Sequence, residues 1–423
     1  MLQIPFLRDN TSDIIDRYQK RGLDAKAKVE AIIALDDQRK ATQTQLDADL
    51  AESNQLAKQI GGLFKEGKTT EANDLKERTK SLKDSSQVLK DRLQEIEDNQ
   101  LEALYQLPNV PNPKVPKGNS EADNELVSEH GSTPKFSFNP KPHWELAKEF
   151  GLIDFELGVK ISGAGFPVYL GKGAKLQRAL INFFLDEAEE AGYNEVIPPL
   201  LVNEASGIGT GQLPDKEGQM YHVTEDDLYL IPTAEVPITN IYRDVILKES
   251  DFPIKNCGFT PCFRREAGSY GKDVRGLNRL HQFDKVEIVQ IQHPDKSYEA
   301  LDQMVNHVKG ILEKLGLQYR ILLLCGGDLG FTSAITYDFE VYSAAQNKWL
   351  EVSSVSNFET FQANRLKLRF KNESGKTELA HTLNGSALAL PRIMAAIMEN
   401  FQTASGIEIP KALHPYIKFD KID

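Results

Sequence analysis

The stretch 263–287 reads FRREAGSYGKDVRGLNRLHQFDKVE and holds the densest polar cluster of the chain. Both of its ends are strand-like, and a loop rich in glycine and charge lies between them. Alternate residues of a strand share a face, so Arg264 is predicted to point with Glu266, and Phe283 with Glu287. Burying unpaired charges costs several kcal/mol, and planar Arg suits phosphate while Phe can stack on a base. The stretch therefore predicts a ligand site, with a solvated hairpin as the alternative.

The whole chain has the composition of a globular enzyme. Its 423 residues are 40% hydrophobic, enough for two or three domains with sizeable cores. The apolar runs are far shorter than the roughly 18 residues of a membrane span, and the N-terminus lacks the pattern of a secretory signal. Three cysteines are predicted to be buried thiols in a reducing cytosol, so a cytoplasmic protein without a membrane partner is expected. The net charge of −12 argues against a protein coated in nucleic acid but leaves room for a local basic patch.

The first hundred residues carry two heptad-like stripes. They run over 32–63 and 75–107, with a break of three glycines and two threonines between them. The spacing predicts two helices of about 50 Å each that pack as an antiparallel hairpin and end at Pro108. Several seam positions are polar, which suits a thin two-stranded arm. A dimerising coiled coil is the alternative.

The remainder is predicted to be α+β. Residues 108–142 contain seven prolines and no regular period, which indicates a linker or extended crossover. Helices are predicted at 176–191, 297–315 and 391–404. Strands are predicted at 195–201, 228–231, 283–291, 319–324, 334–342 and 348–353. Hairpin-like neighbours dominate, which favours an antiparallel sheet with helices packed on it. The chain has no phosphate-binding loop ending in Lys-Ser/Thr, no paired CxxC and no HExxH.

Three motifs, in order, resemble those of class II aminoacyl-tRNA synthetases. They are GYNEVIPPLL at 192–201, the opening stretch at 263–287, and NGSALALPR at 384–392 before an apolar helix. Further segments resemble the seryl-tRNA synthetases within that class, namely GTGQLP, LIPTAEVPITN and EVSSVSNFETFQANR. The helical hairpin resembles their tRNA-binding arm, so the likeness covers essentially the whole chain. Small departures from the family pattern are Ala387 and Pro391 in the third motif.

The resemblance implies an architecture and a reaction. Residues 1–107 would be a tRNA-binding helical arm, 108–142 a linker, and 143–423 a catalytic domain built on an antiparallel sheet flanked by helices. The reaction would attach L-serine to serine tRNA, and to selenocysteine tRNA, through a seryl-adenylate. ATP would be the co-substrate, Mg²⁺ the metal, and the protein a homodimer.

The resemblance also implies roles for particular residues. Arg264 and Arg392 would be catalytic, stabilising charge on the phosphates. Glu351 and Ser354 would hold Mg²⁺, although a structural strand end is the alternative for these two. The expected ATP-binding residues are Arg264, Arg265, Glu266, Phe283, Glu351, Val352, Ser353, Ser354 and Arg392.

Serine and tRNA would be bound by two further sets. Glu235 would pair with the substrate ammonium, and Glu287 would accept from its hydroxyl. The expected serine-binding residues are Thr233, Ala234, Glu235, Arg264, Glu287, Asn384 and Ser386. The outer arm, 58–92, carries nine Lys and Arg against six Asp and Glu. The expected tRNA-binding residues are Lys65, Lys68, Lys76, Arg78, Lys80 and Lys83.

Two other functions are weighed against this one. A ligase on the same scaffold with a carrier-protein acceptor would lack the arm, so residues 1–107 argue against it. A catalytically inactive binding protein would have lost Arg264, Glu351 or Arg392, and all three are present.

Overall fold

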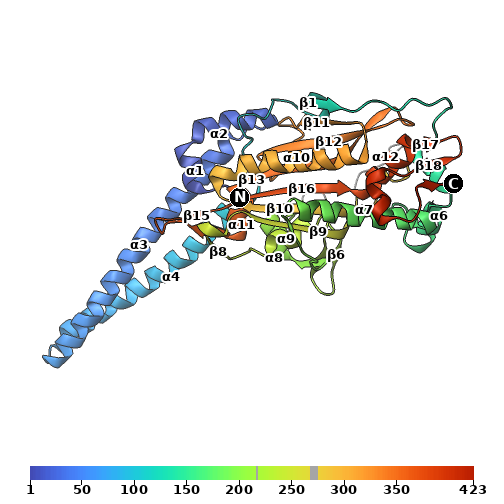
Figure 1. Ribbon diagram of the computed structural model, residues 1–423. Coiled ribbons are helices and arrows are strands. Elements are labelled where there is room, and N and C mark those ends of the chain that lie inside the picture. The colour runs from blue at the N-terminus through green and yellow to red at the C-terminus, as the bar shows by residue number, and fades with distance from the viewer. Residues whose placement is uncertain (216–217, 267–274) are drawn as a thin grey trace. The chain divides into compact units, whose positions relative to one another are not determined.

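The computed structural model describes residues 1–215, 218–266 and 275–423 (Figure 1). The chain divides into two compact units. One, here the helical unit, comprises 2–19 and 23–108. The other, here the sheet unit, comprises Met1, 20–22 and 109–423. The loop predicted within the opening stretch falls mainly at 267–274, outside the described residues.

The helical unit is built on the predicted hairpin. Helix α3 (Lys26–Lys65) packs along α4 (Thr69–Tyr105), and the buried residues fall largely on the predicted stripes. The expected break is shorter than predicted, because α3 continues through Gly61 and Gly62 and the chain turns only at 66–68. An exposed glycine weakens a helix by only about 1 kcal/mol, so both stay helical. Gly67 makes the turn with a φ of +77°.

Two short helices precede the hairpin that the sequence did not predict, α1 (Ile4–Asp9) and α2 (Thr11–Tyr18). Arg8 of α1 donates to the buried carboxylate of Asp36 in α3 at 2.8 Å. Burial alone would raise the pKa of Asp36, but hydrogen bonds from Lys40, Arg8 and Arg39 outweigh it and lower the pKa to about 2. The ion pairs of Asp36 therefore fasten α1 to the hairpin.

The sheet unit contains a sheet of eight strands, antiparallel except for the parallel pair at one edge formed by β4 and β9. In spatial order the strands are β1 (Glu125–His130), β11 (Tyr319–Leu323), β12 (Ile335–Ser343), β13 (Lys348–Glu359), β16 (His381–Ala389), β10 (Gln282–Gln292), β9 (Ile254–Phe263) and β4 (Asn194–Glu195). This confirms the predicted antiparallel sheet and the α+β class.

Three helices pack on one face of this sheet: α7 (Gly171–Glu190), α10 (Ser297–Leu315) and α12 (Leu390–Asn400). Val286 and Ile288 of β10 lie in the core against them. The residues that alternate with these two, Lys285 and Glu287, therefore lie on the opposite face. That opposite face is where the polar residues of the opening stretch gather.

Smaller elements complete the sheet unit. The helices are α5 (His143–Glu149), α6 (Phe155–Ile161), α8 (Glu204–Thr210), α9 (Glu235–Asn240) and α11 (Thr360–Leu366). The small sheets are β2 (Ile153–Asp154) with β3 (Val168–Tyr169); β5 (Leu201–Asn203), β7 (Leu228–Leu230) and β6 (His222–Val223); β15 (Thr377–Leu379), β14 (Arg369–Lys371) and β8 (Ile246–Lys248); and β17 (Gln402–Thr403), β18 (Gly406–Glu408) and β19 (Lys421–Ile422).

The structure differs from the predicted strands in several places, and strand β16, in the middle of the large sheet, was not predicted. The single strand predicted at 195–201 is two short strands, β4 and β5, because Pro198 and Pro199 between them cannot donate to a ladder. Strand β13 continues six residues beyond the predicted 348–353 to Glu359. Strand β1 lies within the proline-rich 108–142, and its mostly exposed side chains give no apolar alternation to detect.

Cys257, Cys262 and Cys325 are buried free thiols, as predicted. Among the helices of the described ranges, none combines the length and the apolar character that a membrane span requires.

Candidate active site

The hairpin of β9 and β10 positions Arg264. The Arg264 backbone N–H donates to the His281 carbonyl at 2.9 Å, which continues the pairing just beyond β9. Its Nε donates to the Pro232 carbonyl at 3.3 Å, and its guanidinium lies 5.2 Å from the centre of the Phe283 ring. Arg264 and the aromatic ring are therefore neighbours on the polar face, a phosphate-binding group beside a stacking surface.

The prediction that Arg264 and Glu266 share a face by strand alternation is wrong. Strand β9 ends at Phe263, and Glu266 has a φ of +48°, so the alternation stops before these residues. Glu266 instead forms an ion pair with Arg279 at 3.3 Å. Arg265 is exposed, and its backbone N–H donates to the Gln219 carbonyl.

Beside Arg264 lies a buried cluster built on Thr233. The Thr233 hydroxyl donates to Glu287 at 2.8 Å and accepts from Lys285 Nζ at 2.9 Å. Lys285 also forms an ion pair with Glu287 at 2.5 Å. All three side chains are nearly inaccessible to water, so the charge of Glu287 is compensated by Lys285 and Thr233 and not by solvent.

Glu235 is the second carboxyl of this cluster. Gln362 Nε2 donates to it at 2.6 Å, and the Gln362 side-chain Oε1 accepts from the Thr382 hydroxyl. Burial, together with the charge of nearby Glu287, raises the pKa of Glu235 to about 7. A buried carboxylate whose hydrogen-bond donor is a neutral amide is suited to receive a cation from outside. Ala234, between Thr233 and Glu235, packs into an apolar cluster and contributes no polar group.

Strand β16 supplies the next residues of the polar face. Ser386 pairs with Glu287 across the ladder, so their side chains lie on the same side of the sheet. Asn384, two residues earlier, shares that face. The Ser386 carbonyl accepts the hydroxyl of Ser353 at 2.6 Å, which ties β13 to β16.

Of the four residues predicted on β13, two face the site. Ser354 donates to Glu351 at 3.4 Å. Val352 instead lies in the hydrophobic core, and the Ser353 hydroxyl donates to the Ser386 carbonyl. A register shift of β13 against β12 brings Glu351 and Ser354, three residues apart, to one side. The side chains of Val352 and Ser353 are therefore not available to a ligand.

Arg392 closes the site from helix α12. Its Nη1 donates to the Glu351 carbonyl at 2.6 Å and lies 3.7 Å from the Glu351 carboxylate. Its Nε donates to the Asn278 carbonyl at 3.1 Å. Glu351 and Arg392, predicted for metal and phosphate, are thus brought together.

The oxygens around Glu351 fit a divalent cation. Asp338 of β12 pairs with Ser354 across the ladder, and its Oδ1 is buried without a hydrogen-bond partner. Burial and the nearby Glu351 charge raise the pKa of Asp338 well above its usual value. Mg²⁺ takes hard oxygens and is often held by one or two carboxylates plus substrate phosphates. Among the described residues, no group of three or more His, Cys, Asp or Glu is placed to hold a metal ion.

The predicted tRNA-binding residues all lie on the outer half of the hairpin and are all exposed. Three of them have partners within it. Lys76 Nζ lies over the Phe64 ring, 4.4 Å from its centre, and Arg78 forms an ion pair with Glu52 at 2.9 Å. The other predicted cations, apart from Lys68, which pairs with Glu66, are not in a described ion pair.

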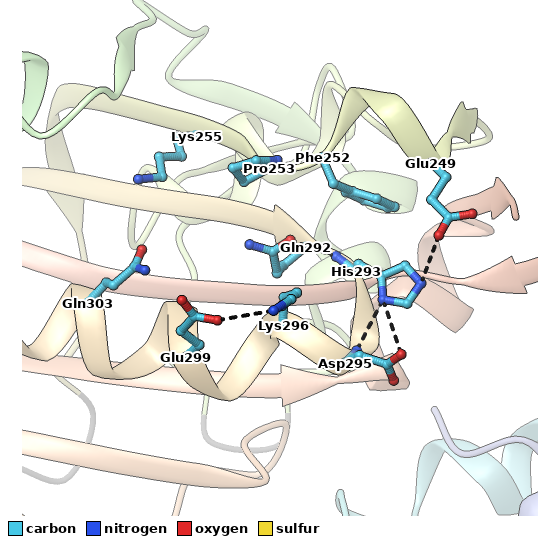
Figure 2. Close-up of a pocket in the computed structure, with 10 residues that line it drawn as sticks. All are labelled: Glu249, Phe252, Pro253, Lys255, Gln292, His293, Asp295, Lys296, Glu299 and Gln303. Carbon is cyan, nitrogen blue, oxygen red and sulfur yellow. Dashed lines mark hydrogen bonds and ion pairs between the residues drawn. The ribbon is translucent and has the colours of Figure 1, made fainter. Parts of the chain in front are cut away.

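A separate pocket of about 540 Å³ opens near the start of α10 (Figure 2). Its lining mixes both signs of charge; Lys296 pairs with Glu299 at 3.5 Å, and the His293 ring lies 3.7 Å from the Glu249 carboxylate. None of the predicted site residues lines it. It therefore has no part in the site on the polar face.

Sequence reasoning missed two members of the site. Lys285 was assigned no role, although the alternation that groups Phe283 with Glu287 places Lys285 on the same face. Gln362 lies 127 residues from Glu235, so no local spacing reveals their contact.

Known proteins share this fold. Family models for the seryl-tRNA synthetase N-terminal domain and for the tRNA synthetase class II core domain (G, H, P, S and T) match residues 1–111 and 220–401. Fold and site together define a class II aminoacyl-tRNA synthetase. Serine–tRNA ligases of Salinibacter ruber and Gloeobacter violaceus are 52% and 46% identical, each pair covering at least 99% of both chains. The seryl-tRNA synthetase of Pyrococcus horikoshii complexed with ATP superposes with a TM-score of 0.94 at 33% identity, over 100% of this chain and 99% of that one. The chain belongs to the serine–tRNA ligase family.

Proposed function

We propose that this protein joins L-serine to serine tRNA in two steps, with ATP first converting serine to seryl-adenylate. The observation that carries the proposal is the buried cluster of Thr233, Glu235, Lys285 and Glu287 directly beside Arg264 and Phe283. An amino-acid pocket thus adjoins a phosphate-binding arginine and an aromatic surface. Such an arrangement suits the attack of a carboxylate on an α-phosphate.

The pocket explains how serine would be selected. Glu235 supplies the counter-charge for the ammonium, since its donor in the protein is the neutral Gln362 amide. Glu287, with Thr233 and Ser386 beside it, accepts from the serine hydroxyl. With alanine, the Glu287 carboxylate lacks the donor that the serine hydroxyl would add to Thr233 and Lys285, and rejection of this kind reaches on the order of 10⁴.

Catalysis would come from positioning and electrostatics without a covalent enzyme intermediate. Arg264 binds the serine carboxylate and the α-phosphate, and Phe283 stacks on the adenine. Glu266 and Arg265 contact the nucleotide, and Arg392 holds its outer phosphates. Glu351 and Ser354 would hold Mg²⁺, which when bound neutralises phosphate charge.

The two other parts of the chain would serve the second step. Residues 1–107 bind the tRNA through the outer arm, and 108–142 connect them to the catalytic residues 143–423. Exposed Lys65, Lys68 and Lys80 offer salt-sensitive phosphate contacts. Selenocysteine tRNA would be charged with serine through the same arm. The cell compartment would be the cytoplasm.

The protein would act as a homodimer through 192–201. Ile197 is 87% exposed, and Leu200 and Leu201 beside it are exposed as well. Contiguous exposed apolar side chains mark interaction surfaces. Neighbouring β4 is an edge strand of the large sheet, so the surface continues with an open edge.

The test is serine-dependent exchange between ATP and pyrophosphate. We expect Arg264→Ala to lower kcat/KM by about a thousandfold, because the charge on the α-phosphate loses its main partner. Arg369→Ala, which removes an arginine of the small β14 strand, is the matched control and should retain full exchange. Full exchange in Arg264→Ala, or exchange supported by alanine or threonine instead of serine, would overturn the proposal.

A further inference from the structure

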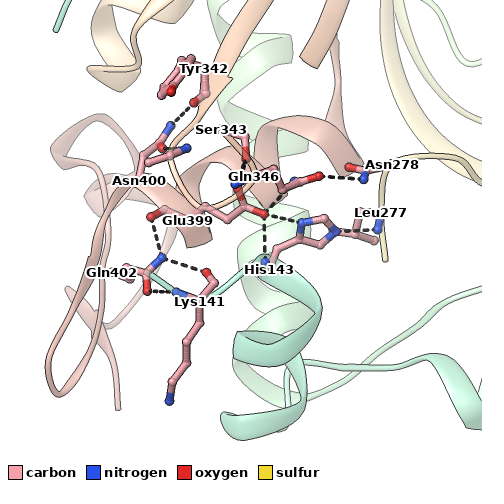
Figure 3. A network of polar contacts seen from close by, with 11 residues as sticks. Lys141, His143, Leu277, Asn278, Tyr342, Ser343, Gln346, Glu399, Asn400 and Gln402 are labelled. Atoms are coloured by element: carbon pink, nitrogen blue, oxygen red, sulfur yellow. Dashed lines mark hydrogen bonds and ion pairs between the residues drawn. The ribbon is translucent and has the colours of Figure 1, made fainter. Parts of the chain in front are cut away.

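A chain of buried hydrogen bonds links helix α12 to the residues that precede β10 (Figure 3). Glu399 of α12 and His143, the first residue of α5, are both completely inaccessible. His143 Nδ1 lies 2.7 Å from Glu399 Oε1, and the His143 backbone N–H donates to the same oxygen at 2.9 Å. Residues 256 apart in sequence are thus joined by two hydrogen bonds.

The hydrogen bond at the second ring nitrogen indicates the tautomer of His143. The Leu277 backbone N–H donates to His143 Nε2 at 2.8 Å. A nitrogen that accepts a hydrogen bond carries no hydrogen, so the proton lies on Nδ1 and points to Glu399. Gln346 and Ser343 also donate to Glu399. Burial alone would raise the pKa of Glu399, but the interactions with His143, and after them the hydrogen bond from Ser343, hold it below its usual value, so the carboxylate is a fixed anchor.

The other end of the chain of bonds is Arg392. Leu277 precedes Asn278, whose carbonyl accepts from Arg392 Nε at 3.1 Å, and whose side-chain amide donates to Gln346 at 3.1 Å. The position of that carbonyl is therefore set by Leu277 on one side and Gln346 on the other. Gln346 in turn donates to Glu399 at 2.9 Å. Both routes from Asn278 end at the same carboxylate.

A glycine marks how closely His143 approaches this segment. Gly276 has a φ of +66°, and a Cβ there would lie 2.1 Å from His143 Nε2. Any side chain at this position would push the imidazole away from the Leu277 N–H. The contact thus requires both the imidazole of His143 and a glycine at position 276.

We infer that His143, anchored by Glu399, is a positioning residue for ATP: it fixes the segment 276–278, whose Asn278 carbonyl orients the guanidinium of Arg392. The inference rests on the proposed role of Arg392 in binding the nucleotide. Arg392 is a long side chain with much rotamer freedom, so a fixed acceptor removes the entropy cost of ordering it when ATP binds. His143 itself touches no substrate.

The inference predicts that loss of His143 changes the KM for ATP but not the KM for serine. In the exchange assay, His143→Ala should raise the KM for ATP about tenfold and leave the KM for serine within about twofold, because the serine pocket is built on other elements. His143→Ala placed on Arg392→Ala should cause no further rise in the KM for ATP. If His143 had only a structural role, the double variant would show a higher KM for ATP than Arg392→Ala, because the two effects would add.

Two further variants keep the test decisive. Gly276→Ala attacks the same contact without removing a buried side chain, so it should reproduce the ATP effect even if His143→Ala unfolds. His381→Ala is the matched control, since His381 is another largely buried histidine with one side-chain hydrogen bond, to Ser297 at 2.8 Å. It should leave both KM values unchanged.

Different outcomes would contradict the positioning role of His143 and the proposed function on which it rests. Wild-type protein without serine-dependent exchange would overturn the proposed function. An unchanged KM for ATP in Arg392→Ala would overturn the role of that arginine. The remaining outcome is a raised KM for ATP in Arg392→Ala together with a normal KM for ATP in Gly276→Ala or in folded His143→Ala. That result would overturn the positioning role of His143 alone.

Discussion

At the scale of single residues, Glu235 has the most consequential environment. Its carboxyl is buried, its hydrogen-bond donor is the Gln362 amide, and its pKa is raised to about 7 by burial and by the Glu287 charge. The protonated form dominates below that pH and carries no charge for an ammonium. Substrate binding at this position is thereby coupled to a proton near neutrality.

This coupling predicts how serine binding depends on pH. As the pH falls from 8 to 6, the KM for serine should rise several-fold, approaching tenfold per unit well below the pKa of about 7, because only ionised Glu235 pairs with the ammonium. The measurement is the KM for serine against pH in the exchange assay, with the KM for ATP recorded in parallel. Glu235→Gln should bind serine weakly and without this pH dependence. An equally steep pH profile in Glu235→Gln would assign the proton to another group.

Residues of the site differ in how far the sequence predicts them. Thr233, Glu235 and Glu287 follow from motif resemblance, and the alternation of β10 places Glu287 on the polar face. Gln362 and the pair of His143 and Glu399 do not follow, because their partners lie 127 and 256 residues away and only the fold brings them together. The spacing of residues along the sequence does not predict such long-range contacts.

At the scale of elements, the hairpin of α3 and α4 has a defined register. Arg78 of α4 pairs with Glu52 of α3, and Ser85 donates to Asp49 at 2.7 Å. The heptad stripes predict the two helices and their pairing. They do not predict the extent of α3 through Gly61 and Gly62, where helical continuity outweighs the poor propensity of glycine.

The register allows a clean truncation of the arm. Removing 53–77 and joining Glu52 to Arg78 by a short glycine-rich turn keeps their ion pair as the new end of the hairpin. We expect tRNA charging to fall by about a hundredfold or more, because the phosphate contacts are lost, while exchange without tRNA stays within about twofold of wild type. Both activities are measured on the same preparation.

A charge variant of the intact arm serves as the matched control. Replacing Lys65, Lys68 and Lys80 by Ala keeps the helices and should reduce the slope of tRNA affinity against salt by roughly two to three. Normal charging by the truncated protein would refute the arm's role in tRNA binding. An unchanged salt slope would remove these three lysines from the contact.

At the scale of the whole molecule, the proposed homodimer would bury the apolar surface at 197–201. We expect wild-type protein to sediment at about twice 47.4 kDa. Ile197→Lys should sediment as the monomer, because a charge in a buried apolar interface costs several kcal/mol. Val88→Lys is the control, since Val88 is also strongly exposed but lies on the arm. A monomeric wild type, or a dimeric Ile197→Lys, would contradict this interface.

Burial along the hairpin is uneven, and this has a dynamic consequence. No residue of α3 beyond Asp49 is buried, and in the facing part of α4 only Ala72 is buried before Leu82. Helices of this kind owe their stability mainly to packing. Amide hydrogens should therefore exchange with solvent progressively faster from Leu46 toward Gly67, a gradient of opening free energy along one element. The tip would then fray and re-form many times during a catalytic cycle, so that it adapts to the curvature of an RNA backbone while the base of the hairpin keeps its register.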